Sequence, residues 1–96
     1  MPIVNRYLIG ESVHVVCTFE DVNGAAVDPT AVTAEYEDPA VVKTAVPSPT
    51  KAATGVYTFD VSPTLAGTWY TRFEGTGANQ GAAESSFVVD VSRFYP

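Results

Sequence analysis

The 96-residue sequence is poor in the residue types on which catalysis, disulfide bonding and membrane insertion depend. Its single cysteine, Cys17, cannot form an internal disulfide, so we expect a chain stabilised by packing in a reducing cytoplasm. Its single histidine, His14, lacks the partners that a general base or a metal ligand normally needs. No run of about 18 apolar residues occurs, so we expect no membrane span. The first residues lack a basic region followed by an apolar one, so we expect no signal peptide.

Cations are also scarce. Five Lys and Arg residues stand against eleven Asp and Glu residues, which gives a net charge of −6. Binding to nucleic acid or to an anionic membrane requires clustered cations, so neither is an expected partner. The acidic charge favours solubility and repulsion between copies of the chain.

Helical periodicity is missing as well, and alternation of apolar and polar residues takes its place. Residues 13–20 alternate, with Val13 and Phe19 among the inward positions and His14 among the outward ones. Residues 31–37, 56–61, 67–74 and 82–91 show the same pattern. We expect the inward positions of these segments to be Val32, Ala34, Tyr36, Tyr57, Phe59, Val61, Trp69, Thr71, Phe73, Phe87, Val89 and Val91.

Two weaker segments complete the expected strands. Residues 41–46 predict an edge strand guarded by Lys43, and residues 7–9 predict a first strand along another edge. Residues 47–55 are expected to form a connecting loop, and residues 62–67 a crossing connection or a short helical turn. The glycine-rich segment 75–81 is expected to be a flexible hairpin turn, because a phosphate-binding loop would need a lysine and a following helix.

Short strands separated by turns every 8–12 residues or so are typical of a β-sandwich. We therefore predict an all-β, immunoglobulin-like antiparallel sandwich of about seven short strands, with residues 1–96 forming a single domain. The second cysteine of antibody-type domains is absent.

The sequence offers no catalytic, cofactor-binding or metal-binding residue, and we expect no cofactor. His14 is interpreted as an exposed strand residue and Cys17 as a buried structural one. The acidic residues Glu35, Glu37 and Asp38 could suggest glycoside hydrolysis or calcium binding, but no calcium-loop spacing accompanies them. Solvated charges are the better interpretation.

Two features suggest an interface instead. The outward face of the last two strands combines apolar, aromatic and charged residues, and the terminal segments 1–6 and 92–96 carry apolar residues. These terminal segments either fold back on the domain or dock on a neighbouring subunit. The candidate interface residues are Ile3, Val4, Tyr70, Arg72, Val88, Phe94 and Tyr95.

A set of motifs, taken in order, resembles a known family. The segments are DPTAVT at 28–33, GVY at 55–57, GTWYTRFEGTG at 67–77, AAESSFVV at 82–89 and SRF at 92–94. Together they look like small immunoglobulin-like virion proteins of tailed bacteriophages, and the similarity covers nearly the whole chain. The chain departs from the family at residues 38–41, where a proline-glycine type of turn would be expected.

The resemblance implies a non-enzymatic structural component of a virion, assembled in the bacterial cytoplasm. Such a protein would bind the capsid surface as a decoration protein or the neck between head and tail. Its partners would be the major capsid protein, connector or tail proteins, and several copies could be present on the particle. The alternative is an immunoglobulin-like binding module that recognises carbohydrate or a host surface, for which Tyr70 is the candidate aromatic platform.

Overall fold

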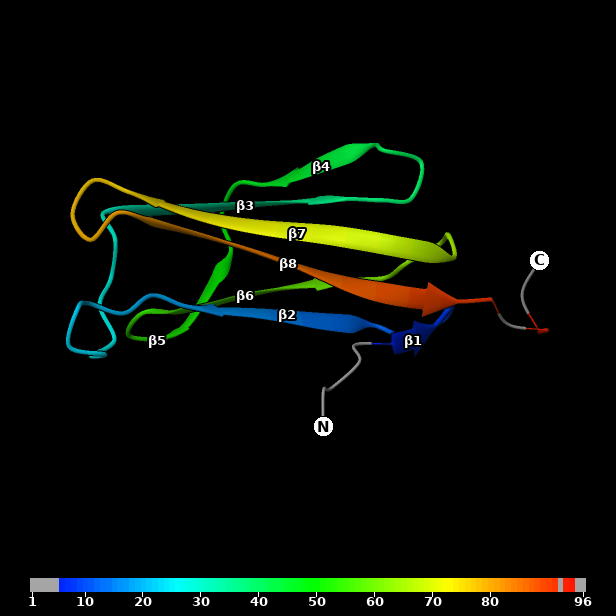
Figure 1. The fold of residues 1–96 in the computed structure, drawn as a ribbon, viewed down its shortest axis with the longest axis horizontal. Coiled ribbons are helices and arrows are strands. Elements are labelled where there is room, and N and C mark those ends of the chain that lie inside the picture. The colour runs from blue at the N-terminus through cyan, green and yellow to red at the C-terminus, as the bar shows by residue number, and fades with distance from the viewer. Residues whose placement is uncertain (1–5, 92, 95–96) are drawn as a thin grey trace.

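The computed structural model describes residues 6–91, 93 and 94, which form two packed β-sheets (Figure 1). The described residues are all-β, as the sequence predicts, and contain eight strands. The strands are β1 (Arg6–Leu8), β2 (Val13–Thr18), β3 (Ala31–Glu37), β4 (Lys43–Val46), β5 (Thr50–Ala53), β6 (Val56–Val61), β7 (Gly67–Thr76) and β8 (Gly81–Asp90).

The strand order is that of an immunoglobulin-like sandwich. One sheet has the order β1-β8-β7-β3-β4 and the other has the order β2-β6-β5. Without β1, the other seven strands have the same order and connections as the strands of those immunoglobulin domains that carry one extra edge strand. The pairs are antiparallel except for β1 and β8, which run parallel with Arg6 opposite Val88. The predicted antiparallel sandwich is therefore confirmed, and β1 is the exception among the described strands, because it runs toward the same end of the molecule as β8.

Alternation along the strands builds the core. The residues buried between the sheets are Val13, Val15, Cys17, Phe19, Ala34, Tyr57, Phe59, Val61, Trp69, Thr71, Phe73, Phe87 and Val89, and Val32 and Tyr36 pack partly buried at its margin. Aromatic rings fill its centre, where Trp69 stacks on Phe87 with centroids 5.9 Å apart. The inward prediction is wrong for Val91, which is 77% exposed because β8 ends at Asp90.

Two connecting segments differ from the prediction. The expected loop at 47–55 contains β5, whose four residues are all exposed and so lack the alternation that would reveal a strand. Residues 62–66 form a crossing connection without a helical turn.

The last hairpin is longer than its sequence suggests. Gly75 and Gly81 pair with each other inside the ladder, so the turn is shorter than the glycine-rich segment. Close packing explains why residue 75 is a glycine, because a Cβ there would lie 2.5 Å from Pro29 Cγ. Because of this pairing, β7 and β8 have ten residues each and are longer than the short strands that the sequence predicts.

Candidate functional site

The two ends of the sandwich differ in chemistry. At one end, the Asp28 carboxylate joins the chain before β3 to the turn between β5 and β6. It accepts hydrogen bonds from the Gly55 backbone N–H at 2.7 Å, the Tyr57 hydroxyl at 3.1 Å and Lys51 Nζ at 2.8 Å. The backbone carbonyl of Asp28 also accepts a bond from the Asn79 side chain at 2.9 Å. This end is therefore closed by polar contacts.

The Asp28 network is structural rather than reactive. The hydrogen bond from Lys51, reinforced by that from the Gly55 N–H, lowers the pKa of Asp28 below its ordinary value. Gly55 has a φ of 74°, and a Cβ there would lie 2.7 Å from the Phe19 carbonyl oxygen. The site therefore holds a carboxylate against a turn that only glycine fits.

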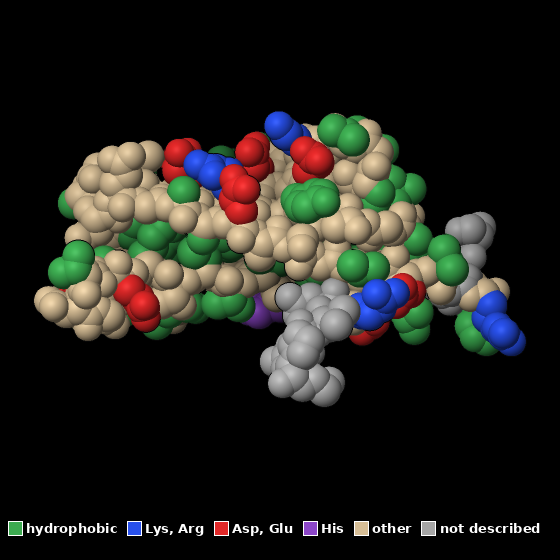
Figure 2. Space-filling view, in the orientation of Figure 1, with side chains coloured by type: hydrophobic (Ala, Val, Ile, Leu, Met, Phe, Trp, Pro, Cys, Tyr) green, Lys and Arg blue, Asp and Glu red, His purple; other side chains and the backbone are tan. Residues whose placement is uncertain are grey.

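The opposite end is apolar. β1, β3, β6 and β8 finish there, and β2, β4 and β7 begin there (Figure 1). Six of the nine exposed large hydrophobic residues lie at or just beyond these strand ends: Leu8, Val41, Val42, Leu65, Val91 and Phe94. We call these six residues the apolar end. Figure 2 shows hydrophobic side chains at this end of the molecule, with charged side chains among them.

The β3–β4 turn presents two of these residues. The carboxylate of Asp38 accepts hydrogen bonds from the backbone N–H groups of Ala40 at 2.9 Å and Val42 at 3.0 Å. The Asp38 carbonyl accepts another from the Val41 N–H. Held in this way, Val41 has a φ of 64° and its side chain is 71% exposed. A β-branched residue is strained in the left-handed region, so this turn sets a valine outward at a cost in stability.

The neighbouring connection between β6 and β7 lies against this turn. A Cβ on Gly67 would lie 2.9 Å from Pro39, so the two loops are in direct contact. The backbone at Leu65 is held by the core, because its carbonyl accepts a hydrogen bond from the buried Trp69 indole at 3.0 Å. Packing thus fixes both loops of the apolar end.

A second candidate surface is the outer face of the larger sheet. Tyr70 and Arg72 point outward from β7, and Val88 shares that face on β8, diagonal to Tyr70 in the ladder. Arg72 donates a hydrogen bond to Glu84 at 2.6 Å and lies 3.5 Å from Glu74. The bond to Glu84 raises the pKa of Arg72 above its ordinary value.

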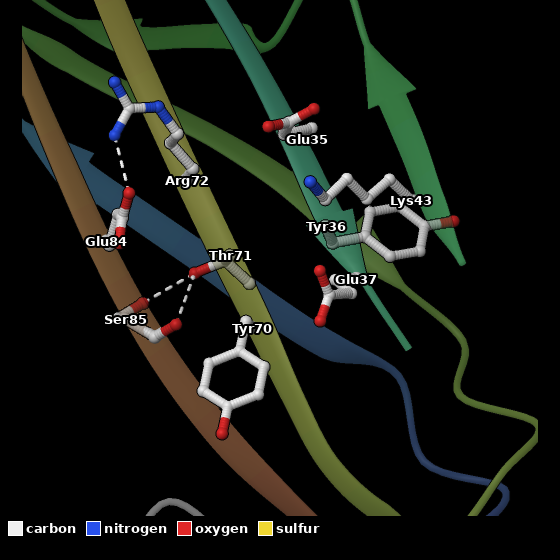
Figure 3. A pocket seen from close by; sticks show the side chains of 9 residues that line it. All are labelled: Glu35, Tyr36, Glu37, Lys43, Tyr70, Thr71, Arg72, Glu84 and Ser85. Atoms are coloured by element: carbon white, nitrogen blue, oxygen red, sulfur yellow. Dashed lines mark hydrogen bonds and ion pairs between the residues drawn. The ribbon is translucent and has the colours of Figure 1, made fainter. Parts of the chain in front are cut away.

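A depression of about 360 Å³ lies on this face (Figure 3). Its lining residues are Glu35, Tyr36, Glu37, Lys43, Tyr70, Thr71, Arg72, Glu84 and Ser85. In register, Arg72 lies opposite Glu35 on one side and Glu84 on the other. Tyr70 lies opposite Glu37 and is 54% exposed. The depression therefore combines an aromatic ring with charged hydrogen-bonding groups, which suits a polar ligand or a protein side chain.

The predicted interface residues fall into separate places. Tyr70, Arg72 and Val88 share the outer face, whereas the exposed Phe94 belongs to the apolar end. Ile3, Val4 and Tyr95 lie outside the described residues. Val16, which also points outward, is on β2 of the other sheet and cannot join the Tyr70 face.

The sequence does not predict the apolar end: of its six residues only Phe94 is predicted to lie at an interface, and Val91 is predicted to lie in the core. Leu8, the pair Val41 and Val42, and Leu65 come from three separate segments, and only the strand order brings them to one end. The sequence does contain one indication of this surface. Two valines come soon after the turn residues Asp38 and Pro39, at positions where a turn usually has polar residues.

The residues weighed for chemistry occupy ordinary positions. His14 is exposed, and its Nδ1 lies 2.7 Å from Asp60 Oδ1. Cys17 is buried in the core, and burial raises the pKa of its thiol. Within residues 6–91, 93 and 94, no group of three or more His, Cys, Asp or Glu side chains could hold a metal ion.

No helix among the described residues is long and apolar enough to cross a membrane. Comparisons with protein-family models, curated proteins and solved structures found no match.

Proposed function

We propose that this chain is a non-enzymatic binding module that attaches to a larger assembly through its apolar end. The observation that carries the proposal is the β3–β4 turn. Its hydrogen bonds hold Val41 in a strained conformation, although the side chain stays 71% exposed. Such strain is more often kept for function than for stability. Docking would bury Val41 and its apolar neighbours, and this burial would offset the cost.

The shape of the apolar end supports attachment rather than catalysis. Its residues project from loops of different strands, and contacts with Pro39 and Trp69 hold two of these loops in place. A preorganised apolar surface loses little conformational freedom on binding. The net negative charge of the chain would keep free copies soluble before they meet the partner.

The resemblance to small phage proteins gives this proposal its specific form. The assembly would be the virion of a tailed bacteriophage, and the chain would decorate the capsid surface or bind the neck. The partners would then be the major capsid protein or the connector and tail proteins, with assembly in the host cytoplasm.

Quantitative mass spectrometry of purified virions tests the specific form. Hundreds of copies per particle are expected for a decoration protein, and about a dozen for a neck protein of ring symmetry. Absence from purified particles would overturn both versions.

Competition between variants tests the docking end. Val42→Ser removes an exposed apolar contact of the apolar end, and Val22→Ser makes the same change at the opposite end, where the side chain is fully exposed. We expect Val42→Ser to reduce incorporation into particles, whereas Val22→Ser leaves it unchanged. Equal incorporation of both variants would contradict docking through this end.

Exposed Tyr70 beside the depression favours a second candidate, recognition of carbohydrate or a host surface. Sugars commonly stack on an exposed ring while neighbouring carboxylates and guanidinium groups bind their hydroxyls. Binding on a glycan array that is lost in Tyr70→Ala and kept in Val42→Ser would support this function over the first. Lack of glycan binding by the parent protein would leave docking through the apolar end as the proposal.

A further inference from the structure

The exposed edges of the two sheets are not equally protected against pairing with another strand. An edge strand presents unpaired backbone groups, and proteins usually block them with lysine, proline, a bulge or a very short strand. β4 carries Lys43 and is followed by Pro47, and β5 carries Lys51 and a register shift. β1 has only three residues and pairs with the last part of β8. The part of β8 that β1 leaves uncovered carries the charged residue Glu84.

β2 has none of these devices. Among the residues that the structure describes, it pairs with β6 alone, in continuous register from Val13 opposite Val61 to Thr18 opposite Val56. Its six residues, Val13–Thr18, include no lysine, proline, glycine or acidic residue. β2 is therefore the unprotected edge of the smaller sheet.

The direction of its backbone groups follows from one hydrogen bond. The N–H of Phe19, just beyond β2, donates to the Gly55 carbonyl at 2.8 Å on the β6 side. Backbone groups alternate along a strand, so those of Val13, Val15 and Cys17 also face β6. Those of His14, Val16 and Thr18 then face away from β6, toward any strand that docks.

The side chains of these residues make the edge self-complementary. His14, Val16 and Thr18 are exposed on the outer face, and Val16 is 54% exposed at the centre. In an antiparallel register about a twofold axis at Val16, the two Val16 side chains meet and His14 of each copy faces Thr18 of the other. On the inner face, Val15 would lie opposite Cys17. No like charges face each other in this register.

Charge also favours this edge as the place where two copies meet. Each chain has a net charge of −6, which opposes contact between copies over most of the surface. The acidic group beside His14, Asp60 on β6, is paired with that histidine in the same chain. β2 itself offers a strip without net negative charge.

From these observations we propose that two copies of the chain pair through β2. Their two three-stranded sheets join into one continuous six-stranded sheet with the order β5-β6-β2-β2-β6-β5. The contact is isologous, so it closes after two copies. Backbone hydrogen bonds from His14, Val16 and Thr18 of each copy hold it together. This surface is separate from the apolar end, which stays open in the pair.

Analytical ultracentrifugation over a concentration series tests the pairing. Val16→Lys places two lysines directly opposite each other in the proposed register, and we expect the dimer Kd to rise about tenfold or more. Ala45→Lys adds the same charge to the exposed edge strand β4 and should leave the Kd unchanged. A parent protein that stays monomeric to about 1 mM, the upper end of practical concentrations, overturns the proposal, as does an equal effect of both variants.

Disulfide trapping tests the register. Directly opposite, hydrogen-bonded residues have Cα atoms about 5.5 Å apart, within reach of a disulfide. Under mild oxidation Val16→Cys should therefore form a covalent dimer. His14→Cys should not, because its two copies would lie roughly 14 Å apart. Cys17 is buried and unchanged in both variants. Equal crosslinking of the two variants would overturn the register.

Hydrogen exchange gives a readout at single residues. The amides of His14, Val16 and Thr18 should become protected as concentration rises, whereas those of Val15 and Cys17 stay protected throughout. Protection of the first set that is independent of concentration, or that appears only when a different protein is added, would contradict pairing between copies.

Discussion

The buried indole of Trp69 donates a hydrogen bond to the backbone carbonyl of Leu65, 3.0 Å away in the connection between β6 and β7. The same indole ring stacks on Phe87 and lies 5.9 Å from Tyr36. One side chain thus links the aromatic core to a loop of the apolar end. Because of this link, a change in the core is expected to alter the presentation of Leu65.

Replacement of Trp69 by alanine should lower the free energy of unfolding by about 3–5 kcal/mol, because it leaves a large cavity among aromatic rings. Trp69→Phe keeps most of the packing but leaves the Leu65 carbonyl without its donor, so we expect a loss of about 1–2 kcal/mol. Urea denaturation of the parent and both variants measures these differences. An alanine variant as stable as the parent would contradict the core position of this residue.

Strain at Val41 predicts that a glycine there stabilises the domain. A left-handed conformation costs a residue with a side chain about 1–2 kcal/mol, and glycine avoids this cost while losing up to about 1 kcal/mol in chain entropy. Val41→Gly should therefore raise the free energy of unfolding by roughly 0.5–1 kcal/mol. Val42→Gly, at a residue without positive φ, should lower it by a similar amount. Thermal unfolding compares the two, and destabilisation by both would show that Val41 is not strained.

The core and the sheets could be predicted because alternation records them directly. Every inward position named in residues 13–19 and 56–61 is buried, since one face of each strand meets the other sheet. β5 could not be found in this way, because all of its residues are exposed and pairing with β6 alone defines it. The prediction for Val91 is wrong because the sequence alternates beyond Asp90, where β8 and its pairing with β1 end.

The candidate surfaces were harder to predict because they depend on strand order. Tyr70 and Arg72 share a face by simple alternation along β7, and the sequence indicates this. The grouping of Leu8, Val41 and Leu65 requires knowledge of which loops meet at one end. The strained φ of Val41 likewise arises from hydrogen bonds to Asp38 that no periodicity records.

The thiol of Cys17 should be unreactive in the folded protein. Burial raises its pKa, so little thiolate forms near neutral pH, and the surrounding core blocks access. We expect a thiol reagent to modify Cys17 only as fast as the domain opens. Thr18→Cys places a second thiol on the exposed face of the same strand, and this thiol should react at once. Rapid modification of the parent protein would contradict a buried Cys17.

Stability at acid pH should depend on Asp28. Its pKa is lowered in the folded state, so its contribution is complete above the ordinary carboxyl pKa of about 3.9 and is lost as pH falls through the lower folded value. Asp28→Asn should therefore be less stable than the parent at pH 7, and the difference should shrink as pH falls below about 4.

Lys51 is the largest cause of this shift, through its 2.8 Å hydrogen bond to Asp28. In a Lys51→Met background, Asp28→Asn should therefore have a smaller effect at pH 7, and the pH dependence of that effect should weaken. Urea unfolding of the four proteins at several pH values completes the cycle. If the effect of Asp28→Asn is the same with and without Lys51, the Gly55 and Tyr57 contacts hold the carboxylate instead.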